Sequence, residues 1–324
     1  MHRLLWRCSR PRKLRPWAAL QQTRHTPSFP YSNTPSAHST QAGAGLARDK
    51  AGTGQEGTQG IRESRHSRAN VSDDELEKFR HLEKEWWNPA SRQGAGPLHS
   101  MNVTRVQYIV RQVGLSLPEA SPLRGSATPL AGLRALDVGC GGGLLSESLA
   151  RLGAEVIGVD PSPENVAVAS AHAQGDSLTR TIRYEATTAK ELENRGEQFD
   201  LVASLEVIEH VEDPAGFVSS LASLTRPGGM LAMSTINRTA KSFALAIVGA
   251  EYLAGIVPVG THDWRKFVPP EDLTAMLQAH GFPGELVETC GLMYNPVSGR
   301  WKENPGDLDV NYIVTALRGS GEKR

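Results

Sequence analysis

The chain has 324 residues, with 35 lysines and arginines against 35 aspartates and glutamates, but residues 1–48 hold eight basic residues and no acidic one. The remainder therefore carries 27 basic and 35 acidic residues, which excludes a broadly basic surface that follows nucleic-acid phosphates. The three cysteines, Cys8, Cys140 and Cys290, are too few and too scattered for a disulfide framework. The sequence contains no run of about 18 apolar residues, so we expect no membrane-spanning helix.

Residues 1–70 have the composition of a targeting segment. The first 40 residues are rich in arginine, serine and threonine, and no apolar core of a secretory signal follows the basic start. We expect a mitochondrial presequence, followed over residues 41–70 by a disordered linker, with cleavage between residues 25 and 70. A chloroplast address and a plain disordered basic tail are the alternatives.

The next segment, residues 71–112, is expected to be helical. The run Ser72-Asp-Asp-Glu75 matches a helix capping box, and Phe79 and Trp86 follow at helical spacing before Pro89 ends the helix. This segment either packs on the body through its aromatic residues or forms a lid over the active site.

From residue 133 onward, apolar runs typical of strands alternate with helical patterns. This order predicts an α/β fold with a doubly wound, mostly parallel sheet. Five strands are expected at residues 133–138, 155–160, 181–186, 199–205 and 230–237. Residues 291–318 contain two further strand-like runs, which predict a C-terminal antiparallel hairpin and seven strands in all. In such sheets ligands bind at the carboxyl ends of the strands.

A glycine-rich turn follows the first strand. The run from Asp137 to Gly143 contains Gly139 and Gly141, and such residues let a backbone approach a ligand closely. Asp160 ends the second strand, where a carboxylate can accept hydrogen bonds from ribose hydroxyls, so we expect an adenosine-containing ligand. The run lacks the third glycine of a dinucleotide fingerprint. Asp137 would repel a pyrophosphate but suits an ammonium, which favours S-adenosylmethionine.

Glu206, Glu209 and His210 follow the fourth strand at positions i, i+3 and i+4. If the segment is helical, the three side chains share one face and could bind a hard divalent cation. Many methyltransferases without a metal carry a Glu-His pair here that only shapes the pocket, so the residues alone leave metal binding open. A bound cation would lower the pKa of a substrate hydroxyl, and one of the three side chains would accept its proton.

Residues 242–260 form an apolar stretch that is interrupted by Glu251 and Pro258 and is therefore poorly suited to span a bilayer. It is either a helix of the substrate cover or an interfacial element that contacts the membrane. In the second case, the flanking Lys241, Arg265 and Lys266 would face anionic lipid headgroups.

Several blocks of residues resemble the class I S-adenosylmethionine-dependent methyltransferases, and more narrowly the ubiquinone biosynthesis O-methyltransferases. The blocks are PLHSMNVTR (97–105), LDVGCGGGLLSESLARLGAEVIGVD (136–160), EVIEHVEDP (206–214), KSFALAIVGAEYLAGIVPVGTHDWRKFVPPEDL (241–273), GLMYNPVSG (291–299) and VNYIV (310–314). The resemblance does not extend to residues 1–70 or to the spacer 113–132.

The resemblance implies a role for individual cofactor-binding residues. It implies that Asp160 binds the ribose, Gly139 lines the methionine end, Leu205 covers the adenine side and Arg105 binds the methionine carboxylate. It also implies Mg²⁺ at Glu206, Glu209 and His210.

The implied activity is methyl transfer to polyprenylated catechol-type intermediates of ubiquinone synthesis, at one dihydroxybenzoate step and one demethylated quinol step. The implied location is the matrix side of the mitochondrial inner membrane, peripheral and in a complex with other enzymes of the pathway. The alternatives are a methyltransferase for another small molecule, a non-catalytic S-adenosylmethionine-binding scaffold and, least favoured, a dehydrogenase.

Overall fold

Helices and strands alternate along the chain, and the computed structural model describes them over residues 85–89, 91, 95–247 and 262–320. The expected presequence and linker, the expected helix start at Ser72 and residues 248–260 of the apolar stretch lie outside the described residues. Among the described helices, none is long and apolar enough to cross a membrane.

The described residues contain eight strands, which form one sheet in the order β3-β2-β1-β4-β5-β8-β6-β7. The strands are β1 Arg134–Val138, β2 Glu155–Asp160, β3 Arg183–Ala186, β4 Phe199–Leu205, β5 Thr225–Ile236, β6 Val287–Asn295, β7 Arg300–Asn304 and β8 Asn311–Leu317. Strands β1 to β5 pair in parallel with one another. Strand β8 pairs antiparallel with β5 and with β6, and β6 pairs antiparallel with β7. The predicted α/β class is confirmed, with eight strands rather than seven.

The additional strand, β7, explains the difference in strand count. Its sequence RWKEN is polar, and it pairs only with β6 at the edge of the sheet. An edge strand with charged side chains lacks the apolar run that marks a buried strand, so it was expected as part of the stretch joining the last two strands. Arg111 of the covering helix pairs with Glu303 of β7 at 2.5 Å and holds this edge against the body.

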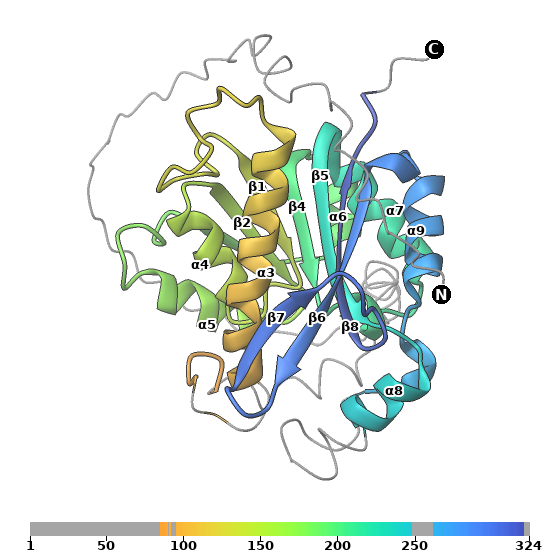
Figure 1. Cartoon of the computed structure of the whole chain (residues 1–324). Coiled ribbons are helices and arrows are strands. Elements are labelled where there is room, and N and C mark those ends of the chain that lie inside the picture. The colour runs from red at the N-terminus through yellow and green to blue at the C-terminus, as the bar shows by residue number, and fades with distance from the viewer. Residues whose placement is uncertain (1–84, 90, 92–94, 248–261, 321–324) are drawn as a thin grey trace, which may run out of the picture.

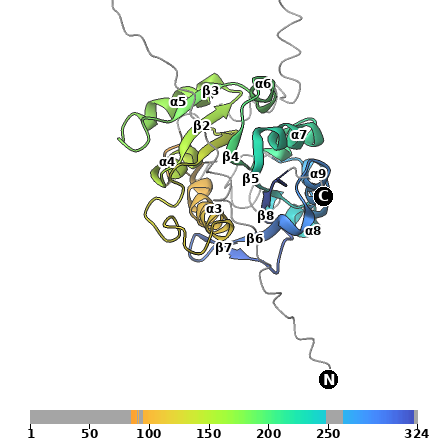
Figure 2. The ribbon, with the colours of Figure 1, turned by 90° about the horizontal axis from the view of Figure 1, so that it is seen from above.

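Helices cover both faces of the sheet. The helices are α3 Ala95–Ser116, α4 Leu144–Arg151, α5 Pro163–Ala173, α6 Ala189–Asn194, α7 Pro214–Leu224, α8 Ala240–Ser242 and α9 Pro270–Ala279, with 3-10 turns η2 Ile208–His210, η4 Trp264–Lys266 and η5 Gly284–Leu286. Figures 1 and 2 show α3, α4 and α5 on one face, and α6, α7 and α9 on the other.

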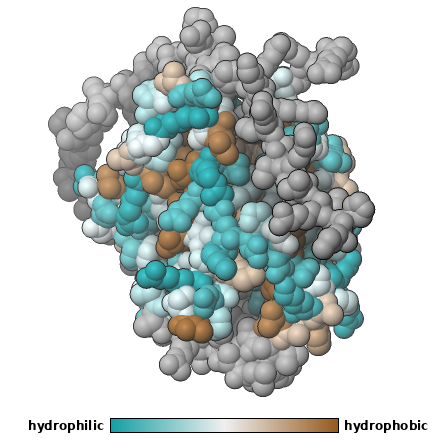
Figure 3. Space-filling model, in the orientation of Figure 1, coloured by the Kyte–Doolittle hydropathy of each residue, from teal (hydrophilic) through white to brown (hydrophobic). Residues whose placement is uncertain are grey.

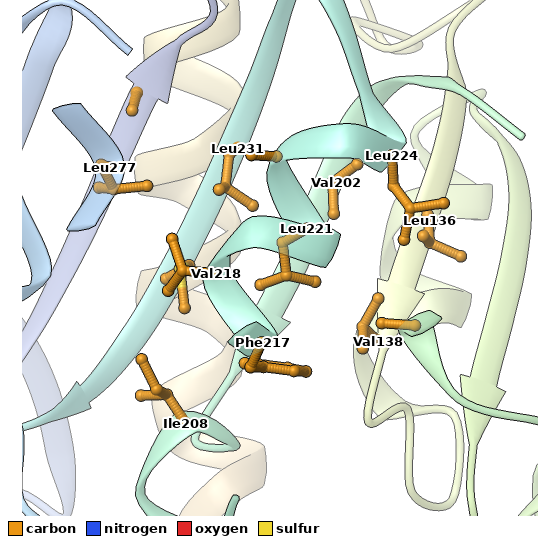
Figure 4. Packing of buried hydrophobic residues seen from close by; sticks show 14 of the residues in the cluster. Leu136, Val138, Val202, Ile208, Phe217, Val218, Leu221, Leu224, Leu231 and Leu277 are labelled. Carbon is orange, nitrogen blue, oxygen red and sulfur yellow. The ribbon is translucent and has the colours of Figure 1, made fainter. Parts of the chain in front are cut away.

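The alternation of side chains along the buried strands divides the core between the two faces. Leu136 and Val138 of β1 pack with α7, whereas Ala135 packs with α3 and α4. In Figure 4 Val218 and Leu221 of α7 point toward the strands. Each such side chain stabilises the fold by about 1.5–3 kcal/mol relative to exposure. The two clusters fix the strands, so the loops at their carboxyl ends have a rigid base.

Helix α3 packs along one face of the sheet through buried residues that include Tyr108, Ile109 and Val113. It is the helical part of the described residues in the segment 71–112 that was expected to be helical, whereas residues 85–87 of that segment form a turn rather than the expected helix. The surface around α3 and β7 is mostly hydrophilic, with separate apolar patches (Figure 3). Arg105, one turn before Ile109, is buried and reaches the carboxyl-end edge of the sheet, where it lies near Glu206.

Candidate active site

The glycine turn after β1 packs against protein side chains on several sides. Gly139 has a φ of 76°, and a Cβ there would lie 2.5 Å from Cγ2 of Val207, in the segment that leaves β4. A Cβ on Gly141 or Gly142 would overlap the Trp86 ring. Gly143, with a φ of 88°, precedes α4. The glycines were expected to admit a ligand; the structure shows that they also admit these neighbouring side chains.

Asp160 ties the glycine turn to the turn after β2. Its Oδ2 accepts a hydrogen bond from the Gly141 N–H at 2.9 Å, and its Oδ1 accepts from the Ser162 N–H at 2.9 Å and from Asn165 Nδ2 at 3.2 Å. Burial raises the pKa of the carboxyl, against the effect of these hydrogen bonds. A carboxylate has about four acceptor positions, so one remains for a hydroxyl in addition to these three bonds.

Asp137, at the end of β1, is a second buried acid beside the turn. Its Oδ2 accepts a hydrogen bond from the Ser146 hydroxyl at 2.6 Å. Burial raises its pKa to about 6, while Ser146 and the nearby Arg105 act in the opposite direction. A buried carboxylate with only partial compensation is a favourable partner for a cationic group such as an ammonium.

Arg105 extends from α3 into the same region and is only 4% exposed. Its Nη1 lies 3.6 Å from Oε1 of Glu206, and neither Nε nor Nη1 has a hydrogen-bond partner among the described residues. Burial lowers the pKa of the guanidinium, although Glu206, Asp137 and Glu209 act to raise it. Unsatisfied donors on a buried guanidinium fit a carboxylate ligand, because such a ligand can accept two parallel hydrogen bonds.

The segment after β4 does not form the expected helical face. Glu206 has a φ of 57°, in the left-handed region, and its N–H donates to the Ser234 carbonyl at 2.9 Å. Residues 208–210 then form the short 3-10 turn η2. A left-handed non-glycine residue is strained and persists only where the surrounding structure holds it, which occurs often at functional sites.

The two glutamates of this segment face β5. Glu206 Oε1 accepts a hydrogen bond from the Ser234 hydroxyl at 2.6 Å, and Glu209 Oε2 accepts one from the Thr235 hydroxyl at 2.8 Å. Burial, followed by the charge of Glu206, raises the pKa of Glu209 to about 7. The His210 ring lies 6.4 Å from the His262 ring, measured between centroids.

These positions bear on the expected Mg²⁺ site. Two carboxylates and an imidazole are suitable donor types, but both carboxylates bond to hydroxyls of β5 and one also lies near Arg105. Over the described ranges, no three His, Cys, Asp or Glu side chains are grouped so that they could hold a metal ion. As placed, Glu206 and Glu209 are bonded to β5 and are not grouped with His210 around a common point, so the metal site stays a prediction.

The structure brings the other expected site residues to one edge. Leu205, the last residue of β4, is partly buried and packs against the core cluster of α3 and α4. Three participants were missed in the sequence, Asn165, Ser234 and Thr235, whereas Trp86 belongs to the segment that was expected to pack on the body or to form a lid. The two hydroxyls at the end of an apolar strand were the one available signal, since polar residues at the carboxyl ends of parallel strands often belong to a site.

Comparisons with known proteins agree with this geometry. A family described as a methyltransferase domain matches residues 136–233. The ubiquinone biosynthesis O-methyltransferase of Cereibacter sphaeroides is 44% identical over 254 residues, which cover 78% of this chain and 98% of that protein. The mitochondrial ubiquinone biosynthesis O-methyltransferase of Arabidopsis thaliana is 46% identical over 251 residues, covering 78% and 76%.

Among solved structures, magnesium protoporphyrin IX methyltransferase from Synechocystis PCC 6803 with bound SAH has a TM-score of 0.51 and 22% identity, covering 76% of this chain and 100% of that one. This similarity supports the fold. The predicted enzyme class and S-adenosylmethionine as methyl donor are confirmed, and the mitochondrial plant relative supports the expected mitochondrial location. The chain carries the buried acids, the arginine and the glycine turn, and over about three quarters of its length it is related to these enzymes. It therefore belongs to the ubiquinone biosynthesis O-methyltransferase family.

Proposed function

We propose that the chain methylates a catechol-type hydroxyl of polyprenylated ubiquinone precursors. The substrates would be a 3,4-dihydroxy-5-polyprenylbenzoate and demethylubiquinol. The observation that carries the proposal is the buried Arg105, whose Nε and Nη1 have no hydrogen-bond partner among the described residues and which lies near Glu206 and Asp137. A methionine carboxylate at Arg105 and an ammonium at Asp137 would direct the sulfonium methyl toward the segment that contains Glu206 and Glu209.

The chemistry required of the protein is alignment and removal of one proton. A phenol resembling tyrosine has a pKa near 10, so forming its anion at pH 7.5 costs about 3.4 kcal/mol. The phenol oxygen attacks the methyl carbon, the carbon–sulfur bond breaks, and S-adenosylhomocysteine leaves with the electron pair. Glu206, Glu209 or His210 accepts the phenolic proton, and close alignment lowers the remaining barrier.

Mg²⁺ remains part of the proposal as an assisting ion. When bound, such a cation lowers the pKa of a phenol and can orient a catechol. Glu206 and Glu209 would have to exchange Ser234 and Thr235 for the metal, so no step above is assigned to it.

The test of the site compares three isosteric variants. Glu206→Gln and Glu209→Gln should each lower kcat by about 100-fold or more if the carboxylates deprotonate or orient the phenol. Glu212→Gln is the matched control, because Glu212 is an exposed acid in the same segment. Wild-type kcat in both test variants would remove the two carboxylates from the mechanism and leave His210 as the proton acceptor of this segment. Assays in Mg²⁺ and in EDTA then show whether the ion contributes.

The membrane part of the proposal concerns residues 242–260, of which the described residues end at 247. Phe243 is 46% and Leu245 55% exposed, as expected of an interfacial element. Lys241, in contrast, pairs with Asp307 at 2.6 Å, which reduces its value for lipid headgroups. The chain would bind peripherally to the matrix face of the inner membrane, in contact with other enzymes of the pathway.

Vesicle binding tests this location. A variant with Phe243→Glu and Leu245→Glu should lose co-sedimentation with cardiolipin-containing vesicles and retain S-adenosylhomocysteine binding. Sedimentation equal to that of the wild type would remove the interfacial role. N-terminal sequencing of the protein purified from mitochondria tests cleavage within residues 25–70, and a retained Met1 would contradict it.

A further inference from the structure

A pair of tryptophans, Trp86 and Trp87, lies on the glycine turn, and we name this pair the tryptophan clasp. Trp86 is 9% exposed, and its indole lies where side chains on Gly141 and Gly142 would otherwise point. The Trp87 Nε1 donates a hydrogen bond to the Gly142 carbonyl at 3.0 Å. The clasp therefore contacts the cofactor turn through both packing and a directed hydrogen bond.

The clasp is also linked to the acid that is expected to bind ribose. The Trp86 Nε1 donates to Asn165 Oδ1 at 3.0 Å, and Asn165 Nδ2 donates to Asp160 Oδ1 at 3.2 Å. An indole nitrogen can only donate, so it orients the amide oxygen of Asn165 toward Trp86 and the amide nitrogen toward Asp160. Two consecutive hydrogen bonds thus run from the clasp to the carboxylate.

A separate set of contacts anchors the clasp. The Trp87 ring stacks on His172 of α5, with centroids 3.4 Å apart and planes 4° from parallel. His172 Nδ1 lies 2.6 Å from Oε1 of Glu147, whose side chain is fully buried, and Arg151 Nη2 lies 2.9 Å from Oε2 of the same carboxylate. This network joins α4 and α5, the helices that follow the two cofactor-binding strands.

The clasp is not part of the main core. Trp86 forms a small cluster of its own with Trp87, Leu98 and Val168, apart from the two large clusters on the sheet faces. Its polar contacts are made with the glycine turn, with α5 and with His99, whose Nε2 lies 2.8 Å from the Trp86 carbonyl oxygen. A segment that serves only to cover apolar surface does not need these directed contacts.

We propose that Trp86 and Trp87 are positioning residues for the adenosine end of the cofactor. Trp86 orients Asp160 through Asn165, and Trp87 holds the glycine turn through the Gly142 carbonyl. The pair thereby preorganises the turn and the carboxylate before the cofactor binds, which reduces the ordering that binding requires. A residue that only packs would affect stability without a selective effect on cofactor affinity.

The test uses variants that keep an aromatic ring and remove only the N–H donor. Trp86→Phe should raise the calorimetric Kd for S-adenosylhomocysteine by about tenfold, the loss of about one well-formed hydrogen bond to a buried partner. The KM for S-adenosylmethionine should rise in parallel, with kcat at saturation unchanged. Trp301→Phe is the matched control, because Trp301 of β7 is partly buried against the core cluster that includes α3 and its Nε1 has no hydrogen-bond partner among the described residues.

A double-mutant cycle separates positioning from packing. Asn165→Ala alone should raise the Kd about as much as Trp86→Phe, and the double variant should be no weaker than either single variant, since both break the same chain of hydrogen bonds. An unchanged Kd in Trp86→Phe, additive effects, or a lower kcat with an unchanged KM would overturn the proposal. Trp87→Phe, which keeps the ring that stacks on His172, provides a second variant should Trp86→Phe fold poorly.

Discussion

The most informative single substitution is Asp137→Asn, because it separates the stability of the protein from its affinity for the cofactor. Burial raises the pKa of Asp137 from 3.8 to about 6. This shift corresponds to a penalty of about 3 kcal/mol for holding the charged form in the folded protein at neutral pH. Asparagine removes the charge and keeps an oxygen that accepts the Ser146 hydrogen bond, while its new N–H, if unpaired, subtracts about 1 kcal/mol.

The sign of the pH dependence follows from the direction of the shift. The pKa of Asp137 is higher in the folded protein than in the unfolded chain, so protonation of this group favours the folded state. This contribution to stability is fully present below pH 3.8 and is lost as the pH rises through about 6. Between pH 5 and pH 7.5 the wild type should therefore lose about 1.4 kcal/mol through this group. The variant should lose none of this contribution and should be more stable than the wild type by about 2 kcal/mol at pH 7.5.

Urea unfolding of the cofactor-free protein at the two pH values measures both effects. Asp272→Asn, on the exposed surface of α9, is the control for the loss of one negative charge. Calorimetry should show that Asp137→Asn weakens S-adenosylmethionine binding by about tenfold or more, since a charge-assisted hydrogen bond to the ammonium is lost. A variant less stable than the wild type at pH 7.5, or one with the same pH dependence, would refute the reasoning.

Three further substitutions, one of them with a matched control on α3, test the rest of the site. Arg105→Lys keeps the charge but loses the planar fork and should weaken S-adenosylmethionine binding by about tenfold in calorimetry; equal affinity would contradict the carboxylate role. Gly142→Ala should push a methyl group into Trp86 and lower Tm by about 2–8 °C. Its control is Gly114→Ala on α3, where a methyl group meets open space and should add about 0.5–1 kcal/mol of stability. A Tm of Gly142→Ala above that of Gly114→Ala would contradict the packing. Ser234→Ala removes the hydrogen bond that holds the Glu206 carboxylate in place, so it should lower kcat with little change in the KM for S-adenosylmethionine. An unchanged kcat would show that this hydrogen bond does not contribute to the reaction.

The buried strands were the most predictable part of the fold. The expected ranges 155–160 and 199–205 coincide with β2 and β4, because parallel strands covered on both faces form continuous apolar runs. The fifth strand was expected at residues 230–237, yet β5 begins at Thr225, which pairs with Phe199 across a shift of register. Pairing with a neighbouring strand can thus extend a strand into residues that locally favour a turn.

The candidate site was predictable residue by residue but not in its geometry. The spacing of Glu206, Glu209 and His210 suits a helix, and only the contact of Glu206 with the Ser234 backbone shows why the chain turns instead. The tryptophan clasp could not be predicted, because Trp87 and Gly142 are 55 residues apart and nothing local connects them. Contacts of this kind depend on how the helices pack on the sheet.

The measurement that tests the central claim most directly is methyl transfer by the full chain. Labelled S-adenosylmethionine and a short-chain prenylated 3,4-dihydroxybenzoate are supplied with Mg²⁺ or with EDTA, and the product is identified by mass spectrometry. The account predicts one labelled methyl on a ring oxygen for each S-adenosylhomocysteine released. Tight S-adenosylhomocysteine binding without transfer to this substrate or to the demethylated quinol would contradict it.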